Sequence, residues 1–548
     1  MTDHAPVPPS RPSARALLLS RPSTRGRWAP ALRGGLAFLL PALTLYGLGF
    51  ERNAVLAALG SFALMYGERR PYRIRWRVNL TTGLLLVASA ALFGALGSWM
   101  GPGGSTAREM TMVGALAALT AVSVFGVNTL RLGPPGPFFL VLVGGVAVVV
   151  CRAGGSPATV ALCTAAGAAA AFIVSMSPGL WRPHGPEIAA TETALAEGER
   201  FLADNREPSR RHSVAASTLN AWSVLHDAAQ IDGDLAHRLW LTHHRVHGAE
   251  AGALMAPLPR PSIVHRLRFG ARLDSHATVT ATRATVATLL AGGVSVLAGL
   301  GRLDWAIMGA VLVLQLGPDR VRGAVRGVHR VLGTLGGLAI FAVLHTLDLH
   351  VAALIVVLAV LNIMIELTVT TNYALAVTFI TPLALLMGAP TQPLGEQMLS
   401  RVIETLLGVA FAVATMWLLF PRIHRSTLRS ADEAARAACS DVLNRASTDV
   451  PASASMRVSR RDLQWQLLEA ELAATDSAND EPAWAYRYWP AHAAVRSVGY
   501  DTLGACWRAG PDTLIGETIR ADLADRVTAS RTIGLTPPPT ERGPEQAG

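Results

Sequence analysis

Long uninterrupted runs of apolar residues constrain this chain more than any other feature of its sequence. They fall in two blocks, residues 34–178 and 280–421. A helix needs about 20 apolar residues to cross a hydrocarbon core of roughly 30 Å. Charged residues make up only 16% of the chain, against about 25% in soluble domains. The sequence therefore predicts an all-α polytopic integral membrane protein with about twelve transmembrane helices.

Each block contains one series of six candidate spans. The predicted spans lie near residues 34–50, 53–67, 78–99, 110–130, 137–151 and 157–176, and near residues 280–300, 303–317, 329–347, 349–367, 371–389 and 401–420.

Polar segments precede, separate and follow the two blocks. Residues 1–33 are rich in Pro, Ser and Arg, which predicts a disordered basic arm. Residues 179–279 and 422–548 regain charged residues at amphipathic spacing, which predicts helical regions outside the membrane. The second of these regions ends in a Pro-, Thr- and Glu-rich tail that is predicted to be disordered.

Arginine is distributed unevenly among the connecting loops. Clusters precede the first block and occupy residues 69–77 and 320–330, whereas the loops on the opposite side carry single arginines. Basic loops remain on the cytoplasmic side of a membrane. We therefore expect both termini and both polar regions to be cytoplasmic, in a multi-pass protein of the inner or plasma membrane.

All 48 basic residues are arginine, because the sequence contains no lysine. This excludes a phosphate-binding loop with its lysine and any Schiff-base lysine. The sequence also lacks a serine-nucleophile elbow and a dinucleotide-binding glycine fingerprint. We therefore predict no enzymatic activity and no cofactor. The net charge of +10 follows the membrane loops and the tail, so no nucleic-acid partner is expected.

Histidines cluster in the central polar region. His243 and His247 are four residues apart, so on a helix they would share one face and could hold a metal ion. No carboxylate or cysteine nearby has the spacing of a third ligand. We therefore interpret them as solvated helix histidines and predict no metal site.

The two apolar blocks resemble each other at a separation of roughly 250 residues. In each block a short apolar segment leads to an arginine-rich loop, and the next span opens with arginine, five residues and glycine. This pattern runs from Arg77 to Gly83 and from Arg330 to Gly336. Since each block holds an even number of predicted spans, the sequence predicts two parallel repeats. Duplicated halves are common in transporters.

Three segments of the second block carry a family resemblance. Residues 322–337 (RGAVRGVHRVLGTLGG), 372–382 and 401–408 are similar to the fusaric acid resistance protein-like family. In the first block, Thr81-Thr82-Gly83 departs from the glycine-threonine pattern. The resemblance implies an inner-membrane protein with duplicated membrane domains and cytoplasmic helical regions. It also implies export of aromatic carboxylic acids.

Four residues are candidates for binding an organic anion. Arg330 and Arg77 begin corresponding spans, and a guanidinium group recognises a carboxylate through two parallel hydrogen bonds. Thr334 follows Arg330 among small residues, and Tyr373 lies before a predicted kink at Pro382. The alternative is that the arginines set topology and contact lipid headgroups, and that the small residues serve helix packing.

Two carboxylates within predicted spans are candidates for proton coupling. Glu404 and Glu366 would cost at least about 2.5 kcal/mol each if charged in the hydrocarbon, so such residues are usually functional. The alternative for Glu404 is an ion pair with Arg401, three residues earlier on the same helix face. Glu366 is expected near the cytoplasmic interface.

The sequence thus predicts a membrane transporter that exports small organic anions by secondary transport. Its expected partners are the anionic substrate and the lipid bilayer, and short spans rich in small residues are compatible with a homo-oligomer. An anion channel remains an alternative, since a channel needs no coupling residue. Another is a non-transporting envelope scaffold that recruits partners through its cytoplasmic helices.

Overall fold

The protein is described by a computed structural model that covers residues 6–11, 13, 18, 26–103, 105–133, 135–204, 207, 210–248, 258, 261–369, 372–387 and 393–533. Within these ranges the regular elements are helices and none is a β-strand, so the predicted all-α class is confirmed. Most of the predicted N-terminal arm and the end of the predicted tail lie outside the described residues.

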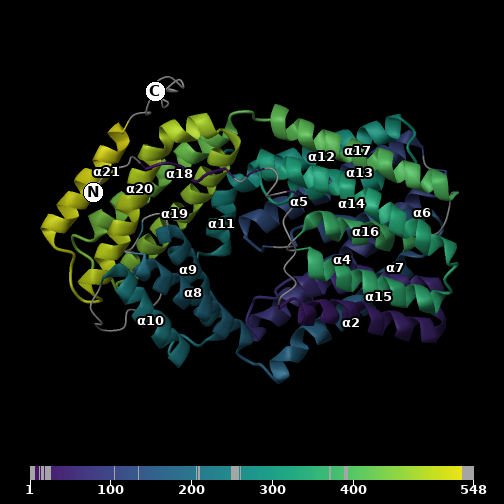
Figure 1. Cartoon of the computed structure of the whole chain (residues 1–548), viewed down its shortest axis with the longest axis horizontal. Helices are drawn as coiled ribbons and strands as arrows, with labels where there is room; N and C mark the ends of the chain where they lie inside the picture. Colours follow the sequence, from purple (N-terminus) through teal and green to yellow (C-terminus); the bar gives the residue numbers. More distant parts are fainter. Residues whose placement is uncertain are drawn as a thin grey trace, which may run out of the picture. The chain divides into compact units, whose positions relative to one another are not determined.

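The chain forms two compact units, whose helices are labelled in Figure 1. The membrane unit contains Ser13–Pro183 and Arg266–Pro421. The helical unit contains Met1–Pro12, His184–His265 and Arg422–Gly548. The long apolar helices belong to the membrane unit, as expected for a multi-pass membrane protein.

Eight of the described helices are long and apolar enough to cross a bilayer. They are α2 with its continuation η1 (Trp28–Phe50), α4 (Tyr72–Met100), α5 (Thr106–Thr129), α7 with η4 (Pro157–Leu180), α12 (His276–Leu297), α14 (Arg320–Thr346), α15 (Val351–Thr368) and α17 (Leu394–Leu418).

Four shorter apolar helices lie at the other predicted positions. They are the segment around α3 (Asn53–Met65), α6 (Phe138–Arg152), α13 (Leu303–Leu314) and α16 (Tyr373–Leu386). The 12 residues of α13 measure only about 18 Å at about 1.5 Å per residue. Length and composition therefore support eight of the predicted twelve spans, and the remaining four helices are too short to cross alone.

Long and short helices follow the same order in the two halves of the membrane unit. In the first half α4 packs against α6 and α7, and α3 packs against α7. In the second half α14 packs against α16 and α17, and α13 packs against α17. The two halves also pack against each other, since α2 lies beside α15 (Figure 1) and α12 packs against α5.

Glycine permits a very close helix crossing in each half. A Cβ atom added at Gly60 of α3 would lie 1.8 Å from the Thr164 carbonyl oxygen, and one at Gly167 of α7 would lie 1.9 Å from that of Ala57. In the second half, a Cβ atom at Gly408 of α17 would lie 2.3 Å from the carbonyl oxygen of Ala306. Small residues allow such backbone contact between membrane helices.

Two buried arginines bind backbone carbonyl groups near the ends of helices. Arg283 of α12 donates to the carbonyl oxygens of Leu419 at 3.1–3.2 Å and of Pro318 at 2.8 Å. Arg75 of α4 donates to the carbonyl oxygen of Ser175 at 3.3 Å, near the end of α7. Leu419 and Ser175 lie at the C-terminal ends of α17 and α7, where carbonyl groups lack donors from the helix itself and a cation is favourable.

The helical unit consists of two groups of helices that pack against each other. Its elements are α8 (Gly185–Ala203), α9 (Arg211–Ala228), α10 (Asp234–His247), α18 (Ile423–Arg445), α19 (Ala454–Asp480), α20 (Pro482–Ala509) and α21 (Glu517–Thr532). Helix α8 packs against α9 and α10, and α18 packs against α19, α20 and α21. The groups meet where α10 contacts α20 and α9 contacts α19. Helix α11 (Ile263–Gly270) contains the boundary between the two units.

A buried histidine joins three helices of the helical unit. Nδ1 of His492 on α20 lies 2.9 Å from Oδ1 of Asp432 on α18, and its Nε2 lies 3.3 Å from Oε2 of Glu471 on α19. Burial alone would lower the pKa of His492, but the two carboxylates and their hydrogen bonds outweigh this effect and raise the pKa to about 9. His492 is therefore a buried cation at neutral pH.

We expect the helical unit to lose stability in mild alkali. The folded-state pKa of His492 lies above the value of about 6.5 for an unfolded histidine, so its contribution is fully present below about pH 6.5 and is lost as pH rises through about 9. The loss should be on the order of 3 kcal/mol. Thermal unfolding of the full chain, followed by tryptophan fluorescence, should show this drop between pH 7 and pH 9.5. His492→Gln should remove the dependence, and an equal drop in this variant would contradict the assignment.

Candidate anion site in the membrane unit

Arg330 lies inside the membrane unit on α14, a helix whose first turn is capped by Asp319. The Asp319 carboxylate accepts a hydrogen bond from the backbone N–H of Arg322 at 2.9 Å. Arg330 and Thr334, one turn later, are each only 1% exposed. Among the described residues, Nε and Nη1 of Arg330 and Oγ1 of Thr334 have no hydrogen-bond partner. Both predicted residues are therefore buried donors with unused capacity.

Helix α16 places Tyr373 near Arg330. A Cβ atom added at Gly333 would lie 2.5 Å from the carbonyl oxygen of Ala374, so the backbones of α14 and α16 are almost in contact. Helix α16 begins at Tyr373, where Asn372 caps the helix by accepting from the backbone N–H of Leu375 at 3.2 Å. The Tyr373 hydroxyl is buried, has no partner within the described ranges, and interacts electrostatically with Arg330.

A second buried arginine, Arg401 on α17, belongs to the same cluster. It is 1% exposed, and its guanidinium carbon lies 3.6 Å from the centre of the Trp305 ring on α13. None of its three side-chain nitrogens has a hydrogen-bond partner in the described part of the chain. Its charge interacts with that of Arg330. The cation–π contact holds the guanidinium group but leaves its donors available.

Glu404 lies one turn after Arg401 and is fully buried. Its Oε1 accepts hydrogen bonds from the backbone N–H of Arg302 at 3.0 Å and from the Ser400 hydroxyl at 2.9 Å. Its Oε2 has no partner among the residues that the structure describes. In the described residues no hydrogen bond joins Glu404 to Arg401, although their opposite charges attract each other.

The other two predicted residues lie outside this cluster. Arg77 is exposed on α4, where its guanidinium group lies 5.3 Å from the centre of the Trp76 ring. Glu366 is buried on α15 and forms an ion pair with Arg27 at 3.5 Å. The structure therefore groups Arg330, Thr334 and Tyr373 beside Arg401 and Glu404, and it gives Glu366 a separate cationic partner.

The segment that supplies this cluster also carries the family match. Residues 289–415 match the model of the fusaric acid resistance protein-like family. Over this segment the chain is similar to that family. The segment includes every residue of the cluster, from Arg330 to Glu404. The comparison with curated proteins and the comparison with solved structures gave no match.

The similarity to the fusaric acid resistance protein-like family indicates a membrane protein of efflux or transport. The matched segment lies entirely within the second half of the membrane unit. The recognition made from the sequence is thus confirmed for this half.

The charged cluster has no equivalent in the first half. Counting from the crossing glycines, Gly60 corresponds to Gly309 and Gly167 to Gly408. The positions that correspond to Trp305, Arg401 and Glu404 are then occupied by Leu56, Val160 and Cys163. The two halves therefore share a helix crossing, but at these positions only the family-matched half carries charged side chains.

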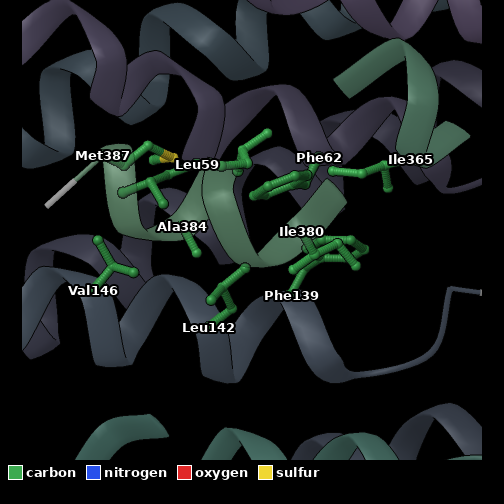
Figure 2. A pocket seen from close by; sticks show the side chains of 10 residues that line it. Leu59, Phe62, Phe139, Leu142, Val146, Ile365, Ile380, Ala384 and Met387 are labelled. Carbon is green, nitrogen blue, oxygen red and sulfur yellow. The ribbon is translucent and has the colours of Figure 1, made fainter. Parts of the chain in front are cut away.

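An apolar cavity lies between the two halves of the membrane unit (Figure 2). Its free volume is about 20 Å³, roughly the room that one water molecule needs. Phe62 and Phe139 of the first half line it with stacked rings whose centres are 4.2 Å apart. Ile380 and Ala384 of α16 line it from the second half. Sequence reasoning missed this cavity, because no local pattern shows which segments meet.

The histidine cluster of the helical unit differs from its sequence-based interpretation. His243 is buried, and its ring lies 4.8 Å from that of His247 and 4.4 Å from that of Trp507. Burial lowers the pKa of His243 to about 3, so the ring is neutral. The interpretation as solvated histidines is wrong for His243, because Trp507 and Trp240 cover it. The described residues contain no group of three or more metal-binding side chains.

Proposed function

We propose that this protein exports small organic anions, with aromatic carboxylates as the substrate class, by secondary transport across the cell membrane. The observation that carries the proposal is the pair of buried arginines, Arg330 and Arg401; Nε and Nη1 of Arg330 and all three side-chain nitrogens of Arg401 have no hydrogen-bond partner in the described protein. A charge in the hydrocarbon costs at least about 2.5 kcal/mol. An anion that accepts hydrogen bonds from both groups would offset that cost.

Each polar residue of the cluster has a role in this proposal. Arg330 and Arg401 bind the carboxylate, because a guanidinium group presents donors that match its geometry. Tyr373 and Thr334 supply hydroxyl donors beside Arg330. Arg77 does not contact the bound anion in this proposal. It belongs to a cytoplasmic arginine cluster that raises the local concentration of anions before export.

We also infer that the two halves are parallel repeats and that both termini lie in the cytoplasm. The shared order of long and short helices and the two glycine crossings support the repeat. The arginine-rich loops support the orientation. In this arrangement the second half carries the anion site and the first half provides the partner surface against which it packs.

The direct test is efflux of a preloaded radiolabelled benzoate from cells that express the chain. Expression should accelerate benzoate efflux compared with an empty-vector control. Benzamide, which is uncharged but similar in shape, should leave the two cell lines at equal rates. Equal rates of benzoate efflux with and without the chain would contradict the proposed function.

Glu404 is the proposed proton-coupling residue, since one of its carboxylate oxygens has no partner in the described structure and it lies one turn from Arg401. Glu404→Gln should abolish the acceleration of benzoate efflux by an imposed proton gradient. The matched control is Glu396→Gln, an exposed position on the same helix, which should retain the gradient response. Full gradient-independent flux in wild type and in Glu404→Gln alike would favour an anion channel instead.

A further inference from the structure

Helix α11 ends beside the start of a helix that is long enough to cross the bilayer. The carbonyl oxygen of Gly270, its last residue, accepts hydrogen bonds from the hydroxyl groups of Ser275 and Thr278. Ser275 also caps α12 by accepting from the backbone N–H of Thr278 at 3.0 Å, and α12 is long and apolar enough to span a membrane. The end of α11 therefore lies at the level where the hydrocarbon core meets the lipid headgroups.

A second set of contacts fixes α11 against the end of α5. A Cβ atom added at Gly270 would lie 2.5 Å from Oγ1 of Thr129, the last residue of α5. Arg266 of α11 donates to the carbonyl oxygen of Leu130 at 3.4 Å. Helix α5 is also long and apolar enough to cross the bilayer. Two helices that meet the membrane boundary thus hold α11 at this level.

One face of α11 exposes apolar side chains. Ile263, Val264 and Leu267 are 64%, 57% and 37% exposed. Leu267 lies four residues after Ile263 and three after Val264, so the three side chains share one side of the helix. Leu273, just after the helix, is 87% exposed. Apolar side chains that gather on one exposed face mark an interaction surface.

Arginines accompany this apolar face. Residues 263–275 contain three arginines, Arg266, Arg268 and Arg272, and one acidic residue, Asp274, so the net charge of the segment is three minus one, or +2. A helix with an apolar face and arginines on its polar side is typical of the membrane–water interface. Each arginine near an anionic membrane surface strengthens binding about fivefold. The segment thus matches an anionic lipid surface in both polarity and charge.

We propose that α11 lies in the surface of the bilayer, with Leu267 and its apolar neighbours below the headgroups and Arg268 against the headgroups of anionic phospholipids. This interaction goes beyond the proposed function, because it does not depend on the transported substrate. Helix α11 directly precedes α12, the first long helix of the second half. The lipid composition of the membrane would therefore act on the half that carries the anion site.

The test places a fluorescent dye on Leu267→Cys in the full chain, which is reconstituted into nanodiscs of phosphatidylcholine with or without phosphatidylglycerol. The four native cysteines are buried, and wild type treated with the same dye gives the background. A phospholipid that is spin-labelled near its headgroup should quench the dye in discs with phosphatidylglycerol. Quenching in phosphatidylcholine alone should be less than half as strong. High salt should also weaken it, because salt screens the headgroup charge.

Charge reversal tests the arginine directly. In the labelled Leu267→Cys chain, Arg268→Glu should remove at least half of the quenching in discs with phosphatidylglycerol. The matched control is Arg238→Glu, which reverses an exposed arginine on α10 and should leave the quenching unchanged. Size-exclusion profiles establish that the compared chains are equally well folded.

Three results would overturn the inference. Protection of the dye from aqueous iodide without quenching by the spin-labelled lipid would show that protein covers this face. Quenching by iodide alone would show that the face is open to water. Equal quenching by the lipid in both kinds of disc would refute the role of anionic headgroups.

Discussion

Replacing Arg330 with alanine should lower benzoate efflux roughly 100-fold, because hydrogen bonds to charged groups contribute about 1.5–3 kcal/mol each and about 1.4 kcal/mol is a factor of ten. Efflux from preloaded cells, corrected for membrane levels by immunoblot, measures the effect. Folding should not suffer, since the variant removes a buried cation with unused donors rather than a satisfied one. A melting temperature equal to or above that of wild type would show that the loss concerns binding.

Two further variants complete this prediction. Arg401→Ala should cause a similar loss, and the double variant should be little worse than either single one, because both arginines bind the same anion. Arg77→Ala is the control, since its exposed guanidinium group should affect the rate only through local concentration. An Arg330→Ala variant that exports benzoate at the wild-type rate would refute the site.

Gly167→Ile should prevent the membrane unit from folding. The first added carbon would already lie 1.9 Å from the carbonyl oxygen of Ala57, so α3 and α7 would have to separate along their whole contact. We expect a loss of more than about 4 kcal/mol, which is exceptional for a single substitution. The yield of monodisperse protein in detergent and its melting temperature measure the loss.

The matched control for this substitution is Gly114→Ile on α5, where an added Cβ atom meets no other atom within 4 Å. It should retain the yield of wild type. Gly408→Ile should repeat the failure of Gly167→Ile, because its Cβ atom would approach the Ala306 carbonyl oxygen to 2.3 Å. Normal yield from Gly167→Ile would show that the close crossing is not required.

The helices and the choice of Arg330 followed from the sequence for physical reasons. Apolar runs bounded by arginine or by glycine and proline specify membrane helices locally, so α14 and α16 lie close to their predicted positions. Arg330 was a candidate because it opens a predicted span and a guanidinium group recognises a carboxylate; its role in binding stays a prediction. The shortness of α13 was visible as well, although its consequence for the number of spans was not.

The partners of the charged residues could not be predicted, because they depend on contacts between distant segments. Arg401 stacks on Trp305, which lies far earlier in the chain, and no local spacing indicates that contact. The sequence instead offered Glu404 as the neighbour of Arg401, since the two share a helix face. His243 was misjudged for the same reason, because Trp507 belongs to another helix of the helical unit.

The short helices of the membrane unit have an electrical consequence. Helix α16 has 14 residues, which measure about 21 Å against a hydrocarbon core of roughly 30 Å. Where short helices form the barrier, the membrane voltage drops over a thinner insulator, and the local field is correspondingly stronger. One elementary charge that crosses about 100 mV gains about 2.3 kcal/mol, which corresponds to a concentration ratio of roughly 50. An inside-negative voltage would therefore expel a monovalent anion through this barrier, and the transported charge could be recorded directly as a current.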